Sequence, residues 1–307
     1  MPRRDLLLMI WVCFSLATSA IVARLVVTNL AVPPLVFTVT RSALVLAFTL
    51  PWLWPLPRPR RWFLATATLF GLGGFTLFFL GLRSAQPASV AIVNQLTIPF
   101  TAALAFVFLG ERPRGQRLVG TVLAIAGVAT VMWRPGALGL SPGLGWIALS
   151  ALASSAAVIT IKRIPNLEPL RLQPWVALSA LLPSALIAPL VDQAPWHRAW
   201  HAGWPLVAAS VYSALVVSLL AQSVNYRLLR RHPANVTAPL MVLAPIFTMA
   251  LGPLITGDTI SIRLLIGGAI ALGGVVLVVR APSATALPQD SRTLPDEAVE
   301  MFATEAH

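Results

Sequence analysis

Long apolar runs alternate with short polar segments along most of the chain. A bilayer core of about 30 Å is crossed by roughly 20 apolar residues in helical form. The runs are continuous and lack the alternation typical of the lipid-facing strands of a barrel. The pattern therefore predicts an all-α membrane protein with ten transmembrane helices, near 6–27, 34–56, 62–82, 88–109, 116–133, 143–161, 173–191, 204–226, 234–255 and 262–279.

Basic residues concentrate in every second connection between these runs. If the N-terminus is cytoplasmic, sixteen of the 22 Lys and Arg residues fall on the inner side and four on the outer side. Positive charge is retained on the cytoplasmic side of membrane proteins. The alternation predicts that both termini are cytoplasmic, and it supports the count of ten because a missed span would destroy it.

The composition excludes a soluble protein. Hydrophobic residues make up 57% of the chain and charged residues 10%, against about 45–50% and about 25% in soluble domains. One cysteine excludes an intramolecular disulfide, and four histidines disfavour a dense metal site. The net charge of +12 is not gathered in a basic run beside stacking aromatic residues, so nucleic acid is not an expected partner. Arginine outnumbers lysine 21 to 1, which is typical of GC-rich bacterial genomes and favours a bacterial inner membrane.

The two ends of the chain differ in character. The first 23 residues resemble a secretory signal, but their apolar run is longer than the 7–15 residues typical of one. Nine further spans follow, so we expect an uncleaved first helix. Residues 281–307 hold five of the ten acidic residues among Pro, Ser, Thr and Ala, which predicts a disordered acidic cytoplasmic tail.

An internal repeat divides the chain. A shift of 146 residues places Pro87-Ala88-Ser89-Val90 on Pro233-Ala234-Asn235-Val236 and Pro99 on Pro245; with one inserted residue, Gly120, Ala124 and Gly127 fall on Gly267, Ala271 and Gly274. The predicted organisation is one five-helix repeat in 1–136, a second in 141–280, and the tail 281–307. Five is odd, so the second repeat must be inverted in the membrane. Inverted repeats are typical of secondary transporters, whose substrate sites lie near the midplane between the halves.

The residues also resemble a known family. The pattern is Ala88, Asn94-Gln95-Leu96-Thr97-Ile98-Pro99, Leu109-Gly110-Glu111-Arg112, Gln116, Gly120 and Gly127. It is similar to the repeat of the drug/metabolite transporter superfamily, EamA type, over about residues 6–280. The resemblance implies ten helices in two repeats and export of amino acids, related metabolites or drugs. The chain departs from the family at Trp11-Val12-Cys13 in the first helix and at Asp258, which replaces a glutamate.

Polar residues within the spans are the candidate site. Arg41 lies about 10 Å into its helix, where it either pairs with backbone carbonyls or attracts a substrate carboxylate. Asn94 and Gln95 lie mid-span, one turn before Pro99. A proline removes a donor, so Pro99 should free the carbonyl of Gln95, and Pro245 that of Met241. The alternative is that each proline only shapes helix packing.

We therefore expect substrate contacts from Arg41, Asn94, Gln95, Pro99, Gln222 and Pro245. Gln222 either lines an exit path or bonds to neighbouring helices. The Gly and Ala ladders predict close helix packing. His197 and His201 have a spacing that suits a metal, but Trp196, Trp200 and Trp204 surround them and favour an interfacial aromatic segment.

The resulting hypothesis is a secondary transporter that exports amino acids or related small metabolites by alternating access. A multidrug or lipid-linked carrier exporter is the alternative in the same class, and a membrane-bound enzyme or a non-transporting scaffold is the alternative in another. An enzyme is disfavoured because no carboxylates or histidines gather at one interface and no P-loop occurs. The expected partners are a small-molecule substrate and the lipid bilayer, a homodimer is left open, and no metal or cofactor is expected.

Overall fold

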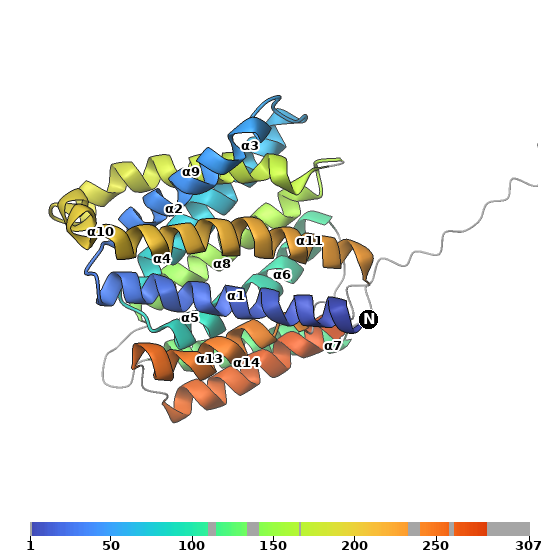
Figure 1. Cartoon of the computed structure of the whole chain (residues 1–307). Helices are drawn as coiled ribbons and strands as arrows, with labels where there is room; N and C mark the ends of the chain where they lie inside the picture. Colours follow the sequence, from blue (N-terminus) through green and yellow to red (C-terminus); the bar gives the residue numbers. More distant parts are fainter. Residues whose placement is uncertain are drawn as a thin grey trace, which may run out of the picture.

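The computed structural model describes residues 2–109, 115–133, 141–165, 167–232, 240–257 and 261–280. The predicted acidic tail 281–307 lies outside these ranges, as do Glu111, Asp258 and residues 233–236, which helped to align the repeats. Helices make up almost the whole described part, and it contains no strand (Figure 1). The prediction of an all-α protein is therefore confirmed.

The helices follow the predicted spans closely. In chain order they are α1 (Arg3–Thr28), α2 (Pro34–Thr49), η1 (Leu50–Trp52), α3 (Arg60–Thr68), η2 (Leu69–Thr76), α4 (Leu77–Leu82), α5 (Pro87–Asn94), α6 (Thr97–Leu109), α7 (Gly115–Met132), α8 (Pro142–Ile161), α9 (Pro169–Val191), α10 (Pro195–Val211), η3 (Tyr212–Ala221), α11 (Gln222–Arg231), α13 (Leu243–Thr256) and α14 (Ile262–Arg280). Several begin with proline at the first helical position, where its missing N–H leaves no hydrogen bond unmade: Pro34, Pro87, Pro142, Pro169 and Pro195.

Nine helical stretches in the described residues are long and apolar enough to cross a membrane. The ninth predicted span, 234–255, corresponds to α13, which begins after a turn at Met241 and Val242; residues 233–239 fall outside the described ranges. The protein is thus a multi-pass membrane protein. The count of ten and the cytoplasmic termini stay predictions.

Three predicted spans are interrupted rather than straight. The third, 62–82, consists of α3, the π-helix η2 and α4, and the eighth, 204–226, contains the π-helix η3 between α10 and α11. The fourth, 88–109, breaks into α5 and α6 at Gln95 and Leu96. The third and eighth spans occupy the same place in the two repeats, so the π-helices are a shared feature. Such segments are rare and occur frequently at functional sites.

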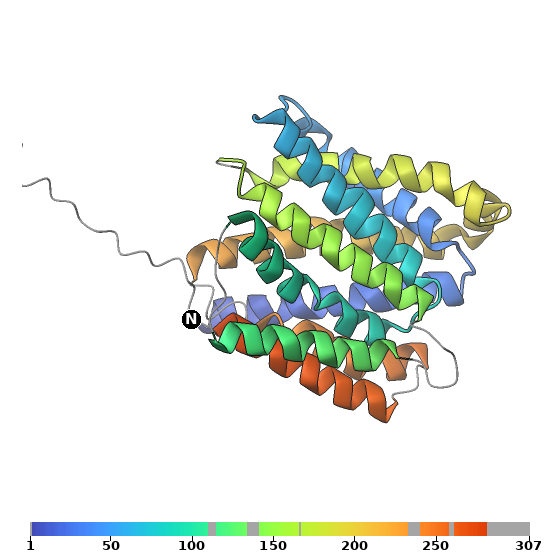
Figure 2. The same cartoon turned by 180° about the vertical axis from the view of Figure 1, so that it is seen from behind.

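Helices α7 and α14, the last of each repeat, lie side by side along their lengths (Figure 2). A Cβ added at Gly120 would lie 2.7 Å from the carbonyl oxygen of Gly274, and one added at Gly267 would lie 2.8 Å from that of Gly127. The two backbones therefore approach as closely as glycine allows. The predicted packing role of the small-residue ladders is confirmed.

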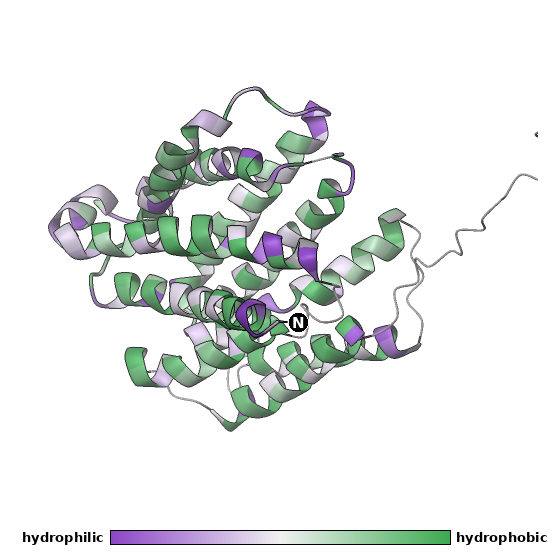
Figure 3. Cartoon of the chain, turned by 45° about the vertical axis from the view of Figure 1, so that its right-hand side comes forward, coloured by the Kyte–Doolittle hydropathy of each residue, from purple (hydrophilic) through white to green (hydrophobic). Residues whose placement is uncertain are grey.

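Hydrophobic residues cover the flanks of the helices, and hydrophilic residues gather near the helix ends (Figure 3). Large apolar side chains such as Val122 on α7 and Ile266 on α14 are more than half exposed. An exposed apolar surface of this extent suits lipid. The buried core lies between the repeats and joins residues from α1, α2, α5 and α8.

Candidate functional site

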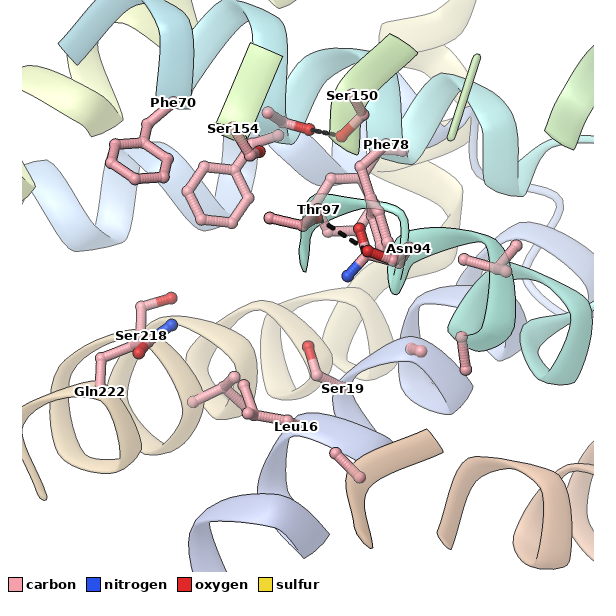
Figure 4. A pocket seen from close by; sticks show the side chains of 18 of the residues that line it. Leu16, Ser19, Phe70, Phe78, Asn94, Thr97, Ser150, Ser154, Ser218 and Gln222 are labelled. Carbon is pink, nitrogen blue, oxygen red and sulfur yellow. Dashed lines mark hydrogen bonds between the residues drawn. The ribbon is translucent and has the colours of Figure 1, made fainter. Parts of the chain in front are cut away.

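A cavity of about 430 Å³ lies between the two repeats (Figure 4). The first four helices of each repeat line it: α1, α2, η2 with α4, and α5 with α6 from the first, and α8, α9, η3 with α11, and α13 from the second. The fifth helices, α7 and α14, contribute no lining residue. Four helices of each repeat thus enclose the chamber, and the fifth helices pack against each other and hold the two repeats together.

Arg41 is the cation of this chamber. It is only 6% exposed, and its Nη2 donates a hydrogen bond to the hydroxyl of Ser218 on η3 at 2.7 Å. Its guanidinium carbon lies 4.3 Å from the ring centroid of Phe75 and 5.7 Å from that of Phe79. Aromatic faces attract a cation but do not neutralise it. The predicted pairing of Arg41 with backbone carbonyls is not seen.

The charge of Arg41 is not balanced within the described part of the protein. Arg41 forms no ion pair there, and its Nε is buried without a hydrogen-bond partner. Leaving a buried donor unsatisfied is costly, and a charged one more so. The described residues that line the chamber also include no Asp or Glu. The electrostatics of the site therefore favour an anionic group on whatever enters it.

Neutral polar side chains complete the chamber. Asn94 and Gln95 lie where α5 ends, and Gln222 lies at the start of α11. Figure 4 shows Asn94 and Gln222 on opposite sides of the space. None of these three amide side chains has a hydrogen-bond partner among the described residues. Each amide can both donate and accept. They are therefore free to bind the polar groups of a small solute.

The backbone at the two prolines differs from the prediction. The carbonyl of Gln95 accepts a hydrogen bond from the N–H of Ile98 at 3.1 Å, and that of Met241 accepts one from Ala244 at 3.2 Å. The prediction that Pro99 and Pro245 leave these carbonyls free is wrong. A tighter turn with bonds to the third residue replaces the one that proline removes. The two turns are related by the same shift of 146 residues.

Five of the six predicted site residues line the chamber: Arg41, Asn94, Gln95, Gln222 and Pro245. Pro99 is buried and does not line it. The lining residue of α6 is Thr97, and a helix turns about 100° per residue. Pro99 therefore lies on nearly the opposite side of that helix.

Several lining residues escaped the sequence analysis. Phe70 and Phe75 on the π-helix η2 and Phe78 on α4 form an aromatic wall. In the sequence they cannot be distinguished from lipid-facing residues. Ser150 and Ser154 on α8 also line the chamber. They are four residues apart in an apolar span, and this spacing indicates that both lie on one polar face of the helix.

The two ends of the bundle are closed differently. At the end opposite the N-terminus, Arg83 after α4 pairs with the buried Asp192 after α9 at 3.0 Å. At the same end, Arg24 donates a hydrogen bond to the carbonyl of Leu82 at 3.2 Å. At the other end, the chamber lining extends to Gln173, in the second turn of α9. An ion pair thus joins the repeats at the end opposite the N-terminus.

Two similar helical repeats around a central chamber with polar lining residues are typical of membrane transporters. The EamA-like transporter family matches residues 4–133 and 141–280, one match for each repeat. The chain belongs to this family.

Comparison with solved structures supports the same fold. One, described as "Crystal structure of protein", superposes with a TM-score of 0.60 at 20% identity, and the match covers 90% of this chain and 96% of that one. At that identity the likeness concerns the fold. No match was found among curated proteins.

Proposed function

We propose that this protein exports amino acids or related small metabolites that carry a carboxylate, by alternating access across a bacterial inner membrane. The observation that carries this proposal is Arg41, a buried and unbalanced cation in the wall of the chamber. The planar guanidinium binds a carboxylate through two parallel hydrogen bonds. Its Nε is buried without a hydrogen-bond partner, so the guanidinium keeps donor capacity that the described part of the protein does not use.

The remaining lining fits the rest of such a solute. The free amides of Asn94, Gln95 and Gln222 can hydrogen-bond to an amino group or to a polar side chain. The aromatic wall around Phe75 offers an apolar surface to an aliphatic or aromatic one. A volume of about 430 Å³ lies within the range of about 300–1,000 Å³ of small-molecule sites.

Alternating access requires the repeats to move against one another. Several contacts between them are single hydroxyl pairs, such as Thr40 with Ser210 at 2.8 Å and Thr18 with Tyr212 at 2.6 Å. Neutral bonds of this kind contribute modestly and exchange partners readily. The Arg83–Asp192 pair is the stronger contact, and we infer that it breaks when the chamber opens toward that end.

The alternatives fit the chamber less well. An exporter of lipophilic cations needs a carboxylate in the chamber, and the described lining has none. A chamber of this size is small for a lipid-linked carrier. An enzyme needs grouped acids or bases at the site, and a scaffold has no use for a buried uncompensated arginine.

The test compares solutes that differ only in the carboxylate. Proteoliposomes with purified protein are loaded with a panel of radiolabelled amino acids or with the corresponding amines, and efflux is measured. We expect efflux of at least one amino acid and none of its amine. Arg41→Ala should weaken the apparent affinity about ten- to a hundredfold, because a hydrogen bond to a charged group contributes about 1.5–3 kcal/mol.

Arg41→Lys keeps the charge without the planar fork, so we expect a milder loss than for Arg41→Ala. Arg198→Ala, which removes an exposed arginine outside the chamber, is the matched control and should transport normally. Proton-coupled efflux of a quaternary ammonium dye by the same vesicles, without amino-acid efflux, would replace this proposal with the multidrug alternative.

A further inference from the structure

A second, smaller cavity of about 250 Å³ lies between α1 and α11, at the end of the bundle that carries the N-terminus. It shares no lining residue with the central chamber. Its walls combine three arginines, Arg4, Arg227 and Arg231, with three apolar residues, Leu8, Val224 and Leu228, and with Asp5. It therefore joins the first helix of one repeat to the third helix of the other.

The deepest lining residue of each helix is apolar. On α1, Arg4 lies in the first turn and Leu8 one turn further in. On α11, Arg231 is the last residue, Arg227 lies one turn before it, and Val224 lies about 10 Å from Arg231 at 1.5 Å per residue. Arg4 and Arg231 therefore line the mouth at the helix ends, Leu8 and Val224 line the floor toward the bilayer interior, and Arg227 and Leu228 lie between these two levels.

The arginines of this cavity are not neutralised. Within the described ranges, Arg4, Arg227 and Arg231 form no ion pair. Among the described lining residues the acid is Asp5, and its carboxylate is bound by Nε2 of His232 at 2.7 Å. Three unpaired guanidinium groups around one cavity attract an anion with several acceptor oxygens, and phosphate is the anion that suits arginine geometry.

We propose that this cavity binds the headgroup of an anionic phospholipid from the leaflet that faces the N-terminus. The three arginines hold the phosphate and the negative headgroup, while Leu8 and Val224, the deepest residues of the cavity, contact the glycerol and the first acyl carbons. Basic pockets between membrane helices bind such headgroups. A soluble phosphate would use the mouth but not the apolar floor, so the lipid is the better fit. The bound lipid bridges the two repeats and stabilises their contact.

Native mass spectrometry of the purified full-length protein tests this site. The protein is titrated with dioleoylphosphatidylglycerol in the presence of dioleoylphosphatidylcholine, and the bound fraction of each is measured. We expect wild type to retain phosphatidylglycerol selectively. The double variant Arg227→Gln/Arg231→Gln should bind it about thirtyfold more weakly, because each basic residue near a membrane surface contributes a factor of about five.

Two variants control for charge and position. Arg227→Lys/Arg231→Lys keeps the charge and should retain most of the selectivity. Arg280→Gln removes an exposed arginine at the end of α14, outside the cavity, and should bind like wild type. Gel filtration checks that every variant is folded. If the double variant is not folded, Arg4→Gln takes its place, and we expect it to bind phosphatidylglycerol about fivefold more weakly than wild type.

Two results would overturn the proposal. The first is unchanged phosphatidylglycerol binding by a folded Arg227→Gln/Arg231→Gln variant, or by Arg4→Gln in its place. The second is complete displacement of the lipid by millimolar inorganic phosphate, which would make the cavity a site for a soluble anion. Neither result depends on transport, so the test is independent of the proposed function.

Discussion

Individual side chains of the chamber keep unused hydrogen-bonding capacity. Asn94, Gln95 and Gln222 lack partners in the described part of the chain, and Arg41 uses only part of its guanidinium. In a membrane interior such groups are costly and mark functional positions. A solute that satisfies several of them at once gains affinity from each, so the loss of one amide should weaken binding without abolishing it.

Asn94→Ala and Gln95→Ala test this at the scale of one residue. Each variant should raise the apparent substrate constant about two- to tenfold, because a neutral hydrogen bond contributes about 0.5–1.5 kcal/mol. Amino-acid efflux from proteoliposomes gives the constant, and Asn29→Ala at the exposed end of α1 is the matched control. Loss of both variants from the membrane would instead identify Asn94 and Gln95 as packing residues.

The helices that line the chamber contain π-helical segments or breaks, whereas the helices that hold the repeats together are regular α-helices. The π-helices η2 and η3 and the break between α5 and α6 all line the chamber. The α7–α14 pair is uninterrupted, and its glycines let two backbones meet. A substitution in that pair should therefore act through stability rather than through substrate affinity.

Two glycines provide a matched test of this element. A Cβ at Gly127 would lie 2.6 Å from the Gly267 carbonyl oxygen, whereas a Cβ at Gly273 meets no atom. Gly127→Ala should lower the thermal unfolding midpoint in detergent, since overpacking costs about 1–3 kcal/mol. Gly273→Ala should leave the midpoint unchanged or raise it slightly. Equal midpoints for both variants would show that the α7–α14 contact is looser than described.

Over the whole molecule, arginines gather at the end of the bundle that carries the N-terminus. Arg61 and Arg163, from different repeats, lie over the same ring of Trp62 at 5.6 and 5.8 Å. The three arginines of the smaller cavity lie at the N-terminal end of the bundle too. This gathering agrees with the alternation of basic connections in the sequence and makes that end the predicted cytoplasmic one.

Reporter fusions test the orientation of the whole molecule. The connection near residue 140 belongs to the end with few basic residues, and residue 168 belongs to the other. Fusions of alkaline phosphatase after residue 140 should be active and those after residue 168 inactive, with the reverse for a cytoplasmic fluorescent reporter. The opposite pattern at either position would contradict cytoplasmic termini.

The sequence by itself determined the class of this protein, its helices and its repeat. Runs of about twenty apolar residues have few alternatives to helices in a bilayer, because every backbone group must find its partner within the segment. The ladders of Gly120, Gly127, Gly267 and Gly274 identified a close helix contact for a similarly local reason. Large polar residues stand out against an apolar background, so Arg41, Asn94, Gln95 and Gln222 could be identified before the structure, whereas the serines and threonines of the lining were not.

Only the tertiary structure decided which apolar residues face the chamber and what each polar group contacts. Pro99 and Thr97 are two residues apart, yet only Thr97 lines the space, because helix rotation separates them by about 200°. Phe75 lies against Arg41 on η2, a π-helix, in which successive side chains point in different directions from those of an α-helix. In lipid, the inner and outer faces of a helix are both apolar, so hydrophobicity does not encode direction, and only packing against the neighbouring helices sets it.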